Sequence, residues 1–595
     1  MFRKLFALSL IVTLLIVGVA PSTADEAPAD WQADLAWAEA AIPSGLDLAL
    51  PEESTTRAAT NPKLDSALAE LAGTPGGERS GVAASDGLRL ENGRVQVQLV
   101  VDEGDEAAAR QAVEQAGGEV TGSFAGVMQA WLPPDQLTTL AALDVVDYIQ
   151  MPPTAVPAED DALAAMTEGV AAANAAAWHT AGWRGQGRRV AIIDGGFQGY
   201  TSLLGVDLPQ TVTVKNFVDG QTDAQVNGTT SHGTACAEIV HDMAPMAQLY
   251  LLKISTDIDL SEAVSYAISQ NVDIISTSLT FINVTPGDGT GRFATLAQNA
   301  RNKGILWVTA AGNYRETHWS GTFKDTDGDG LHEYASGVEV NVFGPGNGQA
   351  YLIPGGASLS LSIRWDDWTA VNQDYRLLLL RHDGSAFQIV GSSDNPQKGM
   401  PGQRPTERIS YVTSGSAAIY GVAVQRMSSN RDVYLHLLTP NRKLDRRIPS
   451  MSLGNLADVP AVLTTAAVDA KSPFPREAYS SEGPTNGPGG APTGGAVKPD
   501  LAAFANVSTR SYGTRGFNGT SAATPHVAGA AALVFNAYPV SLPGEVQDYL
   551  ATWAVDQGLA GKDTQFGYGR LLLGSPPSPW DYDYHSFVPS VMSNR

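Results

Sequence analysis

The chain has 595 residues, 43% of them hydrophobic, which is enough for several folded domains and excludes a globally disordered protein. Its formal charge of −24 argues against binding to nucleic acid, because contact with the phosphate backbone depends on lysine and arginine. The single cysteine, Cys236, excludes an internal disulfide, so stability has to come from core packing or bound metal ions.

The first segment has the features of a secretion signal. Two basic residues precede an apolar run from Leu5 to Ala20, and small residues follow at 21–24. A membrane anchor is the alternative, but the run is shorter than the roughly 20 residues that span a bilayer. We therefore expect a signal peptide over 1–24, a secreted, extracellular protein and no stable membrane anchor.

Composition and pattern then change along the chain. Residues 25–92 are rich in Ala, Pro, Gly and acidic residues and indicate a loosely ordered leader. Residues 93–151 have a βαββαβ order, which is typical of a small α+β sandwich. Residues 165–314 alternate apolar strands, such as Val190–Ile193, with helices, such as 232–243. This alternation predicts a parallel sheet that is covered on both faces.

Between 315 and 450 the apolar runs become short and strand-like, and Asp383-Gly384 is placed as a hairpin turn would be. We expect an all-β sandwich inserted into the α/β domain, which resumes over 451–573, with helix-rich sequence after Asp458. The tail, 574–595, has no assignable structure. The predicted fold class is α/β, with a doubly wound, mainly parallel sheet, an N-terminal α+β domain and an inserted all-β sandwich.

Three polar side chains stand out against the apolar pattern. Asp194 ends an apolar strand, where functional groups gather in open α/β sheets, although Asp-Gly is also common in turns. His232 begins a helix in SHGTACAEIV, where a lone histidine is usually structural. Ser521 starts a slim, alanine-rich helix in GTSAATPHVAG, with Pro525 expected in its first turn. Free N–H groups there can stabilise an oxyanion, although an ordinary N-cap serine is also frequent.

Taken together, the order Asp, His, Ser with these flanking residues resembles the subtilisin-like serine peptidases. Asp194 matches the Asp motif of that family, His232 its His-Gly-Thr motif and Ser521 its Gly-Thr-Ser-x-Ala motif. Asn313, which ends ILWVTAAGN, matches the family's oxyanion-hole asparagine. The resemblance implies a serine endopeptidase that forms an acyl-enzyme. His232 would take the proton of Ser521, and Asp194 would hold the imidazole.

The same resemblance, which extends over 182–314 and 451–573, implies how the substrate binds. A protein or peptide substrate pairs as an extended strand, and the implied substrate-binding residues are Ser278, Leu279, Thr280, Ala311 and Gly312. The family usually has glycine at the position of Thr280, whose side chain narrows the pocket. Residues 93–151 resemble the family's propeptide, an intramolecular inhibitor that self-cleavage between 151 and 166 removes. An unrelated small domain is the alternative.

The triad requires no cofactor for its chemistry, but one segment has the spacing of a calcium loop. In DTDGDGLHE, Asp325, Asp327 and Asp329 alternate before Gly330, and Glu333 follows them. The glutamate expected at the twelfth position is absent, so an acidic turn is the alternative to a structural calcium site.

Two further residues are interpreted as structural. His526 lies on the serine helix while His232 already supplies the base, and Cys236 follows His232 by one helical turn, where a buried thiol is commoner than a nucleophile. Two other functions fit the same residues, namely a non-catalytic binding or adhesion protein on a peptidase fold and an esterase that uses the triad. The role of the inserted module is left open, because such modules bind substrates or partners or brace the fold.

Overall fold

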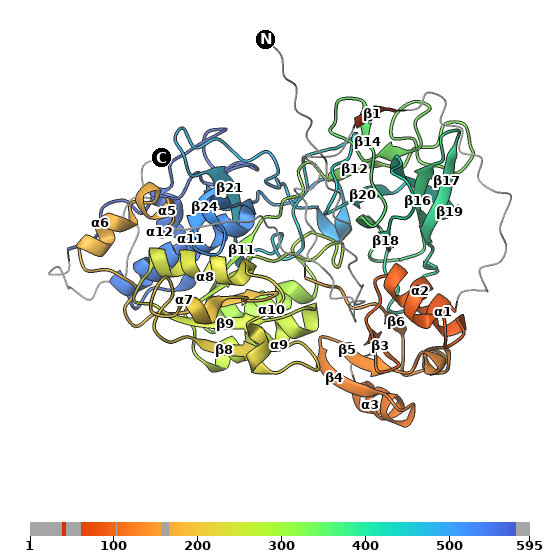
Figure 1. The fold of residues 1–595 in the computed structure, drawn as a ribbon, viewed down its shortest axis with the longest axis horizontal. Coiled ribbons are helices and arrows are strands. Elements are labelled where there is room, and N and C mark those ends of the chain that lie inside the picture. The colour runs from red at the N-terminus through yellow and green to blue at the C-terminus, as the bar shows by residue number, and fades with distance from the viewer. Residues whose placement is uncertain (1–38, 43–60, 103, 156–165, 579–595) are drawn as a thin grey trace, which may run out of the picture.

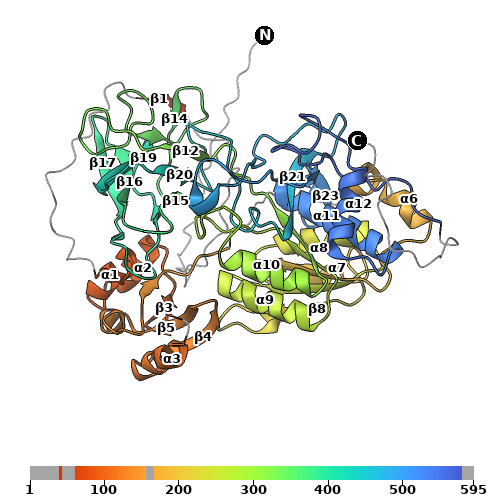
Figure 2. The same ribbon diagram turned by 180° about the vertical axis from the view of Figure 1, so that it is seen from behind.

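The computed structural model describes residues 39–42, 61–102, 104–155 and 166–578. The predicted signal peptide, the junction at 156–165 and most of the tail lie outside these residues. Both views show an α/β domain, an all-β part, and a small N-terminal domain that lies beside both (Figure 1, Figure 2). No helix of the described residues is long and apolar enough to cross a membrane.

Seven parallel strands form the central sheet, in the spatial order β22-β21-β11-β10-β7-β9-β8. Their bounds are Arg189–Asp194 (β7), Thr213–Asn216 (β8), Gln248–Lys253 (β9), Ile274–Thr277 (β10), Leu306–Ala310 (β11), Val462–Asp469 (β21) and Leu501–Ala505 (β22). The inner strands are buried on both faces, because helices cover both sides of the sheet. The predicted α/β class with a parallel sheet is therefore confirmed.

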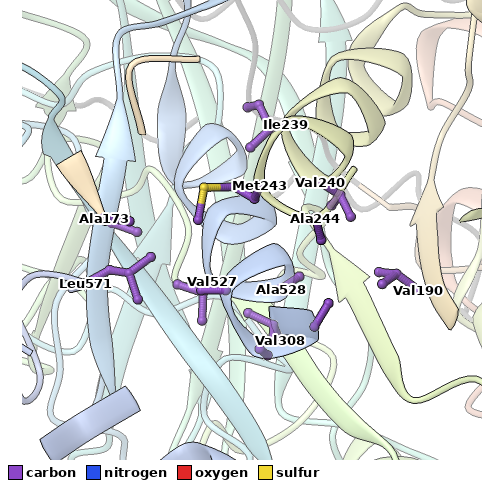
Figure 3. Close-up of a cluster of buried hydrophobic side chains, with 14 of the residues drawn as sticks. Ala173, Val190, Ile239, Val240, Met243, Ala244, Val308, Val527, Ala528 and Leu571 are labelled. Carbon is purple, nitrogen blue, oxygen red and sulfur yellow. The ribbon is translucent and has the colours of Figure 1, made fainter. Parts of the chain in front are cut away.

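Two helices cover each face of this sheet. The helices on one face are α8 (His232–Met243) and α11 (Gly519–Ala537), and those on the other are α9 (Asp257–Ser269) and α10 (Arg292–Asn302). Val240 of α8 and Ala244, which follows this helix, lie next to Ala528 of α11 in the core (Figure 3). The helices approach closely because Gly529 has no side chain, since a Cβ there would lie 2.4 Å from the Cβ of Met243.

The strand order reverses at β7. From β7 the chain first adds β8 and β9 on one side and then crosses to β10 on the other. In such sheets the carboxyl ends of the strands at the reversal border a crevice in which ligands bind. Asp194 ends β7 and Ser278 follows β10, so both residues lie at this crevice.

The prediction of a helix-rich region from Asp458 to about Leu573 is only partly right. The region begins with β21, β22 and a hairpin, and its helices are the later elements. The hairpin and the last helix are bounded by Val507–Thr509 (β23), Gly513–Phe517 (β24) and Pro543–Trp553 (α12). The strand β22 reads LAAFA, and its alanines favour a helix in isolation although burial in the sheet makes it a strand.

The N-terminal domain has the predicted strand and helix order, but it begins earlier than residue 93. Its elements in that order are β3 (Arg94–Val100), α3 (Glu106–Gln115), β4 (Glu119–Phe124), β5 (Val127–Leu132), α4 (Leu137–Ala141) and β6 (Tyr148–Gln150). Two helices, α1 (Ser66–Gly73) and α2 (Arg79–Ser85), precede them. Leu64, Leu68 and Leu71 are part of this domain's core, so the leader predicted over 25–92 is wrong from about residue 61. The Ala- and Gly-rich composition hid their helical spacing.

The all-β part interrupts the chain between β11 and β21, and we call residues 318–438 the all-β module. Its two four-stranded sheets have the orders β12-β20-β15-β18 and β13-β19-β16-β17, and they share one hydrophobic cluster. The strands are His318–Thr322 (β12), Asn341–Val342 (β13), Gln349–Tyr351 (β14), Ser358–Trp365 (β15), Asp374–His382 (β16), Phe387–Ser393 (β17), Thr406–Val412 (β18), Tyr420–Ser428 (β19) and Tyr434–Leu438 (β20). Asp383-Gly384 does connect two antiparallel strands, β16 and β17.

Candidate active site

Asp194 and His232 are in direct contact at the carboxyl end of β7. His232 Nδ1 lies 2.9 Å from each carboxylate oxygen of Asp194, and both side chains are fully buried. An ionised carboxylate only accepts hydrogen bonds, so Nδ1 carries the ring proton and Nε2 is the basic nitrogen. The contact needs Gly233, because a Cβ there would lie 2.7 Å from that of Asp194. Phe517, which sequence analysis missed, packs edge-on against the imidazole.

Ser521 is the third residue of α11, so its backbone N–H is among the first four, which have no partner inside the helix. Its hydroxyl donates to the Ser278 carbonyl at 3.0 Å. Pro525 lies in the second turn of α11 and not, as predicted, in the first. A proline there has no N–H for the carbonyl four residues earlier, which is that of Ser521. Ser278 Oγ donates to this carbonyl instead, at 3.0 Å.

Asn313 follows β11 and contacts the start of α11. Its Oδ1 accepts hydrogen bonds from the backbone N–H and the hydroxyl of Thr520, each at 3.0 Å. These two bonds identify the oxygen of the amide. Among the described residues, Asn313 Nδ2 is then buried without a hydrogen-bond partner. A buried donor of this kind is costly unless a ligand oxygen binds to it. The amide that carries it contacts Thr520, the residue before Ser521.

The residues of this site lie within a segment that matches a known family. The model of the Subtilase family matches residues 185–569, which is more than half of the chain. The chain belongs to the subtilase family. This finding confirms the family inferred from the motifs, and the seven parallel strands agree with the α/β fold expected for it.

Three comparisons show how similar this subtilase is to individual proteins. It is 38% identical to the "Extracellular serine protease" of Serratia marcescens over 82 residues, which are 14% of this chain and 8% of that protein. It is 26% identical to "Subtilisin E" of Bacillus subtilis (strain 168) over 280 residues, which are 43% of this chain and 66% of that one. The solved structure of the Clostridium perfringens CspB protease aligns with 69% of this chain and 96% of its own, at 16% identity and a TM-score of 0.48.

Cys236 lies behind the Asp–His pair of this subtilase. Its sulfur is within 4.8 Å of a ligand atom of Asp194 and of His232. It also donates to the Ser521 carbonyl at 3.8 Å, so the thiol contacts the same oxygen as Ser278 Oγ. Both donors compensate the hydrogen bond that the proline at 525 cannot make.

His526 lies further along α11 and contacts a different part of the chain. Its Nδ1 lies 2.8 Å from the Ala522 carbonyl and its Nε2 lies 2.7 Å from Thr167 Oγ1. Burial lowers the pKa of His526 to about 3, so the imidazole is neutral at the pH of most natural environments. These contacts tie α11 to the segment that follows the junction.

The residues implied to bind substrate follow two neighbouring strands, β10 and β11. One of these residues, Thr280, has its hydroxyl hydrogen-bonded to that of Tyr314. The Tyr314 ring lies against Gly312, where a Cβ would come within 2.7 Å of the ring. Tyr314 also packs with Leu438 of β20, so the all-β module supports this region from behind. Tyr314 could not be predicted from sequence, because a tyrosine after AAGN belongs to no recognised motif.

The sheet of the N-terminal domain lies against the start of α9. Gln98 Nε2 donates to Asp257 Oδ1 at 2.8 Å, and Gln129 Nε2 donates to Asp259 Oδ1 at 3.4 Å. Asp257 is also paired with Arg292 of α10 at 2.5 Å. Burial raises the pKa of Asp259 to about 6. Neutral glutamine amides of the N-terminal domain thus face carboxyl groups of the α/β domain.

The segment after β6 continues as an extended strand along the α/β domain. Thr154 forms an antiparallel bridge with Thr256, and the N–H of Ala155 donates to the Ser255 carbonyl at 2.8 Å. Ser255 and Thr256 lie between β9 and α9, on the same side as the crevice. The segment after β6 thus pairs through its backbone with the loop that follows β9.

The acidic segment DTDGDGLHE lies between β12 and β13 of the all-β module. The carboxylates of Asp325, Asp327 and Asp329 lie within 4.8 Å of one another. Asp325 is also paired with Arg426 at 2.7 Å. Glu333 lies outside this group and instead accepts a hydrogen bond from Lys324 at 3.2 Å. The structure therefore brings together three of the four residues of the predicted calcium site.

Proposed function

We propose that the chain is a secreted serine endopeptidase in which Asp194, His232 and Ser521 form the catalytic triad. The observation that carries this proposal is the buried contact between His232 Nδ1 and both oxygens of Asp194, in a chain of the subtilase family. An imidazole without a buried carboxylate partner would lack the acceptor that holds its tautomer and stabilises its charged form. The signal-like N-terminus and the similarity to the extracellular serine protease of Serratia marcescens support an extracellular location.

The mechanism follows from the donors and acceptors at the site. His232 Nε2 takes the proton of Ser521 Oγ, which leaves the Ser278 carbonyl and attacks the scissile carbonyl. Asp194 stabilises the imidazolium that forms. Asn313 Nδ2 and the backbone N–H of Ser521 donate to the tetrahedral oxyanion. The imidazolium then protonates the leaving amine, and water, activated by the same base, hydrolyses the acyl-enzyme.

In this proposal the substrate binds as an extended strand between the residues that follow β10 and β11. Ser278, Leu279 and Thr280 form one wall, and Ala311 and Gly312 form the other. The backbone pairing of Ala155 with Ser255 supports this binding mode, because a segment of the chain itself already pairs with a loop on the same side of the sheet. The hydrogen-bonded pair of Thr280 and Tyr314 favours substrates with small side chains next to the cleaved bond.

The N-terminal domain acts as the propeptide in this proposal, and the all-β module is a β-sandwich inserted in the catalytic domain. The contacts of Gln98 and Gln129 with α9 support the inhibitory role, since they hold the domain beside the crevice. Self-cleavage between 151 and 166 would separate it. Calcium binding by Asp325, Asp327 and Asp329 is a further part of the proposal, with a role in stability only.

The proposed function is tested with the variant Ser521→Ala in the full chain. Loss of the serine or histidine from a subtilisin lowers kcat about 10⁶-fold, so casein hydrolysis should fall to background. The variant should also accumulate as the uncut precursor. A Ser521→Ala chain that hydrolyses casein normally would disprove the assignment, whereas normal processing of this variant would indicate a separate protease. Parallel assays on peptide and ester substrates distinguish a peptidase from an esterase.

A further inference from the structure

The all-β module contacts the N-terminal domain directly, through side chains of its own. Asn395 Oδ1 accepts a hydrogen bond from the backbone N–H of Ser66 at 2.8 Å. Ser66 is the first residue of α1, and the first N–H groups of a helix need a partner from outside the helix. A helix of the N-terminal domain is therefore capped by a side chain of the all-β module.

Asn395 is held in the orientation that this contact requires. Its Nδ2 donates to Glu407 Oε2 at 3.0 Å, and its backbone N–H donates to Glu407 Oε1 at 2.8 Å. Gln397 Nε2 donates to the same carboxylate at 2.9 Å, and Glu407 itself is 1% exposed. With Nδ2 used in this way, Oδ1 is the amide atom that remains for Ser66. A buried carboxyl group of the module thus fixes the orientation of Asn395 Oδ1, so the contact with Ser66 is not a chance surface contact.

One more contact joins the same two parts, and another joins the module to a segment upstream of the N-terminal domain. Gln403 Nε2 donates to the Pro62 carbonyl at 3.0 Å, while its Oε1 accepts from the N–H groups of Lys398 and Met400 within its own loop. Further upstream, β1 (Glu39–Ala41) pairs antiparallel with β14. Figure 1 and Figure 2 agree in placing α1 and α2 directly against the end of the module that carries β16 and β18.

The surfaces also fit closely where the three parts meet. A cavity of about 50 Å³ lies there, lined by residues that include Tyr148 of the N-terminal domain, Asn283 of the α/β domain and Arg404 of the module. This volume has room for only a few water molecules. Gly402 approaches the Tyr148 backbone so closely that a Cβ on residue 402 would lie 3.2 Å from the backbone nitrogen of Tyr148. The N-terminal domain is therefore packed against the module as well as against α9.

We propose that the all-β module is a second docking surface for the N-terminal domain and holds it on the enzyme after the junction has been cut. This inference rests on the proposed function, in which the N-terminal domain is the inhibitory propeptide. Cutting between 151 and 166 leaves the contacts of Asn395, Gln403 and β14 intact, because their partners all precede the cut. Release then requires separation from two surfaces, so the module slows the appearance of activity.

The test compares two substitutions at Ser66 in the full chain carrying Ser521→Ala. Ser66→Pro removes the N–H that Asn395 binds, and proline is well tolerated at the first position of a helix. The preceding residue, Asp65, has φ −52° and ψ 139°, which suits a residue before proline. Ser66→Ala keeps the N–H and is the matched control. A site for a specific external protease placed within 158–163 gives the cut without any need for peptidase activity.

A second pair of variants covers the case in which Ser66→Pro does not fold. Gln403→Glu keeps the acceptors for Lys398 and Met400 but replaces the donor to the Pro62 carbonyl by a carboxylate oxygen. Gln388→Glu makes the same change at an exposed position of β17 and is its control. Each cut chain is immobilised by a C-terminal tag, and loss of the N-terminal fragment is followed by interferometry.

We expect the fragment to leave the Ser66→Pro chain about fivefold faster than the Ser66→Ala chain, which corresponds to about 1 kcal/mol for one capping bond. Gln403→Glu should likewise release it faster than Gln388→Glu. Equal rates within each folded pair, or a fragment that leaves every chain within the dead time, would overturn the proposal. Failure of the unmodified chain to cut itself would count against the proposed function only, because the external cut does not depend on Ser521.

Discussion

The two ends of the Asn313 amide have different tasks, and substitution can separate them. Oδ1 holds the start of α11 through Thr520, whereas Nδ2 is the buried donor available to an oxyanion. Asn313→Asp keeps the oxygen that accepts from Thr520 and replaces the Nδ2 donor by a second oxygen, which only accepts. Asn313→Ala removes both. Removal of such a donor from a subtilisin lowers kcat about 10²- to 10³-fold, or about 2.7–4 kcal/mol. We expect at least this loss for both variants.

The assay measures kcat and KM on a chromogenic peptide, together with the melting temperature of each variant. Because the donor acts on the transition state, kcat should fall while KM changes little. Asn313→Asp should retain more of the melting temperature than Asn313→Ala, since it keeps the contact with Thr520. A kcat of Asn313→Asp within threefold of the unmodified enzyme would refute the role of Nδ2.

Three further predictions concern the thiol, the docked domain and the acidic loop. Cys236→Ala should keep kcat within about twofold, because the Ser278 hydroxyl still donates to the Ser521 carbonyl that the thiol contacts. A tenfold loss of kcat would argue for a direct role of the thiol. Asp259 lies against Gln129 of β5 and Glu262 against Gly122 of β4. Burial raises the pKa of Asp259 to about 6 and that of Glu262 to about 7. Docking should therefore be strongest below the ordinary pKa values of these groups and should weaken as pH rises through 6 to 7. Interferometry should show faster fragment release at pH 8 than at pH 5, with a smaller difference in Glu262→Gln, and a rate independent of pH would contradict this. A chelator should lower the melting temperature of the unmodified chain but not that of a chain with Asp327→Asn and Asp329→Asn; an equal effect on both, or none on either, would remove the calcium site.

Much of the α/β fold follows from local pattern. Continuous apolar runs separated by amphipathic stretches predicted the parallel sheet, and the helix expected over 232–243 has those bounds in the structure. The errors arose where composition and packing disagree. Residues 61–92 are rich in alanine and glycine, which hid helices that pack three leucines into a core. The strand LAAFA has little β propensity, and only its place between neighbouring strands and helices makes it extended.

In the candidate site, too, residues that are placed by long-range packing could not be predicted from the sequence. Asp194, His232, Asn313 and Ser521 stand in motifs, so they could be named before their contacts were known. Tyr314 could not, because its position beside Gly312 depends on packing against a strand of the all-β module. Asn395 is another such case, since only the folded chain brings it to a helix that begins 329 residues away in sequence. Long-range contacts of this kind leave no local signal.

The central claim is that His232 activates Ser521 as a nucleophile, and a serine-reactive fluorophosphonate tests it most directly. The reagent is added to the processed chain, and the modified residue is identified by mass spectrometry of its peptides. We expect one adduct on Ser521, lost in a folded His232→Ala chain that has been cut by the external protease at the site within 158–163. A processed, folded chain that stays unlabelled, or that is labelled equally well without His232, would contradict it.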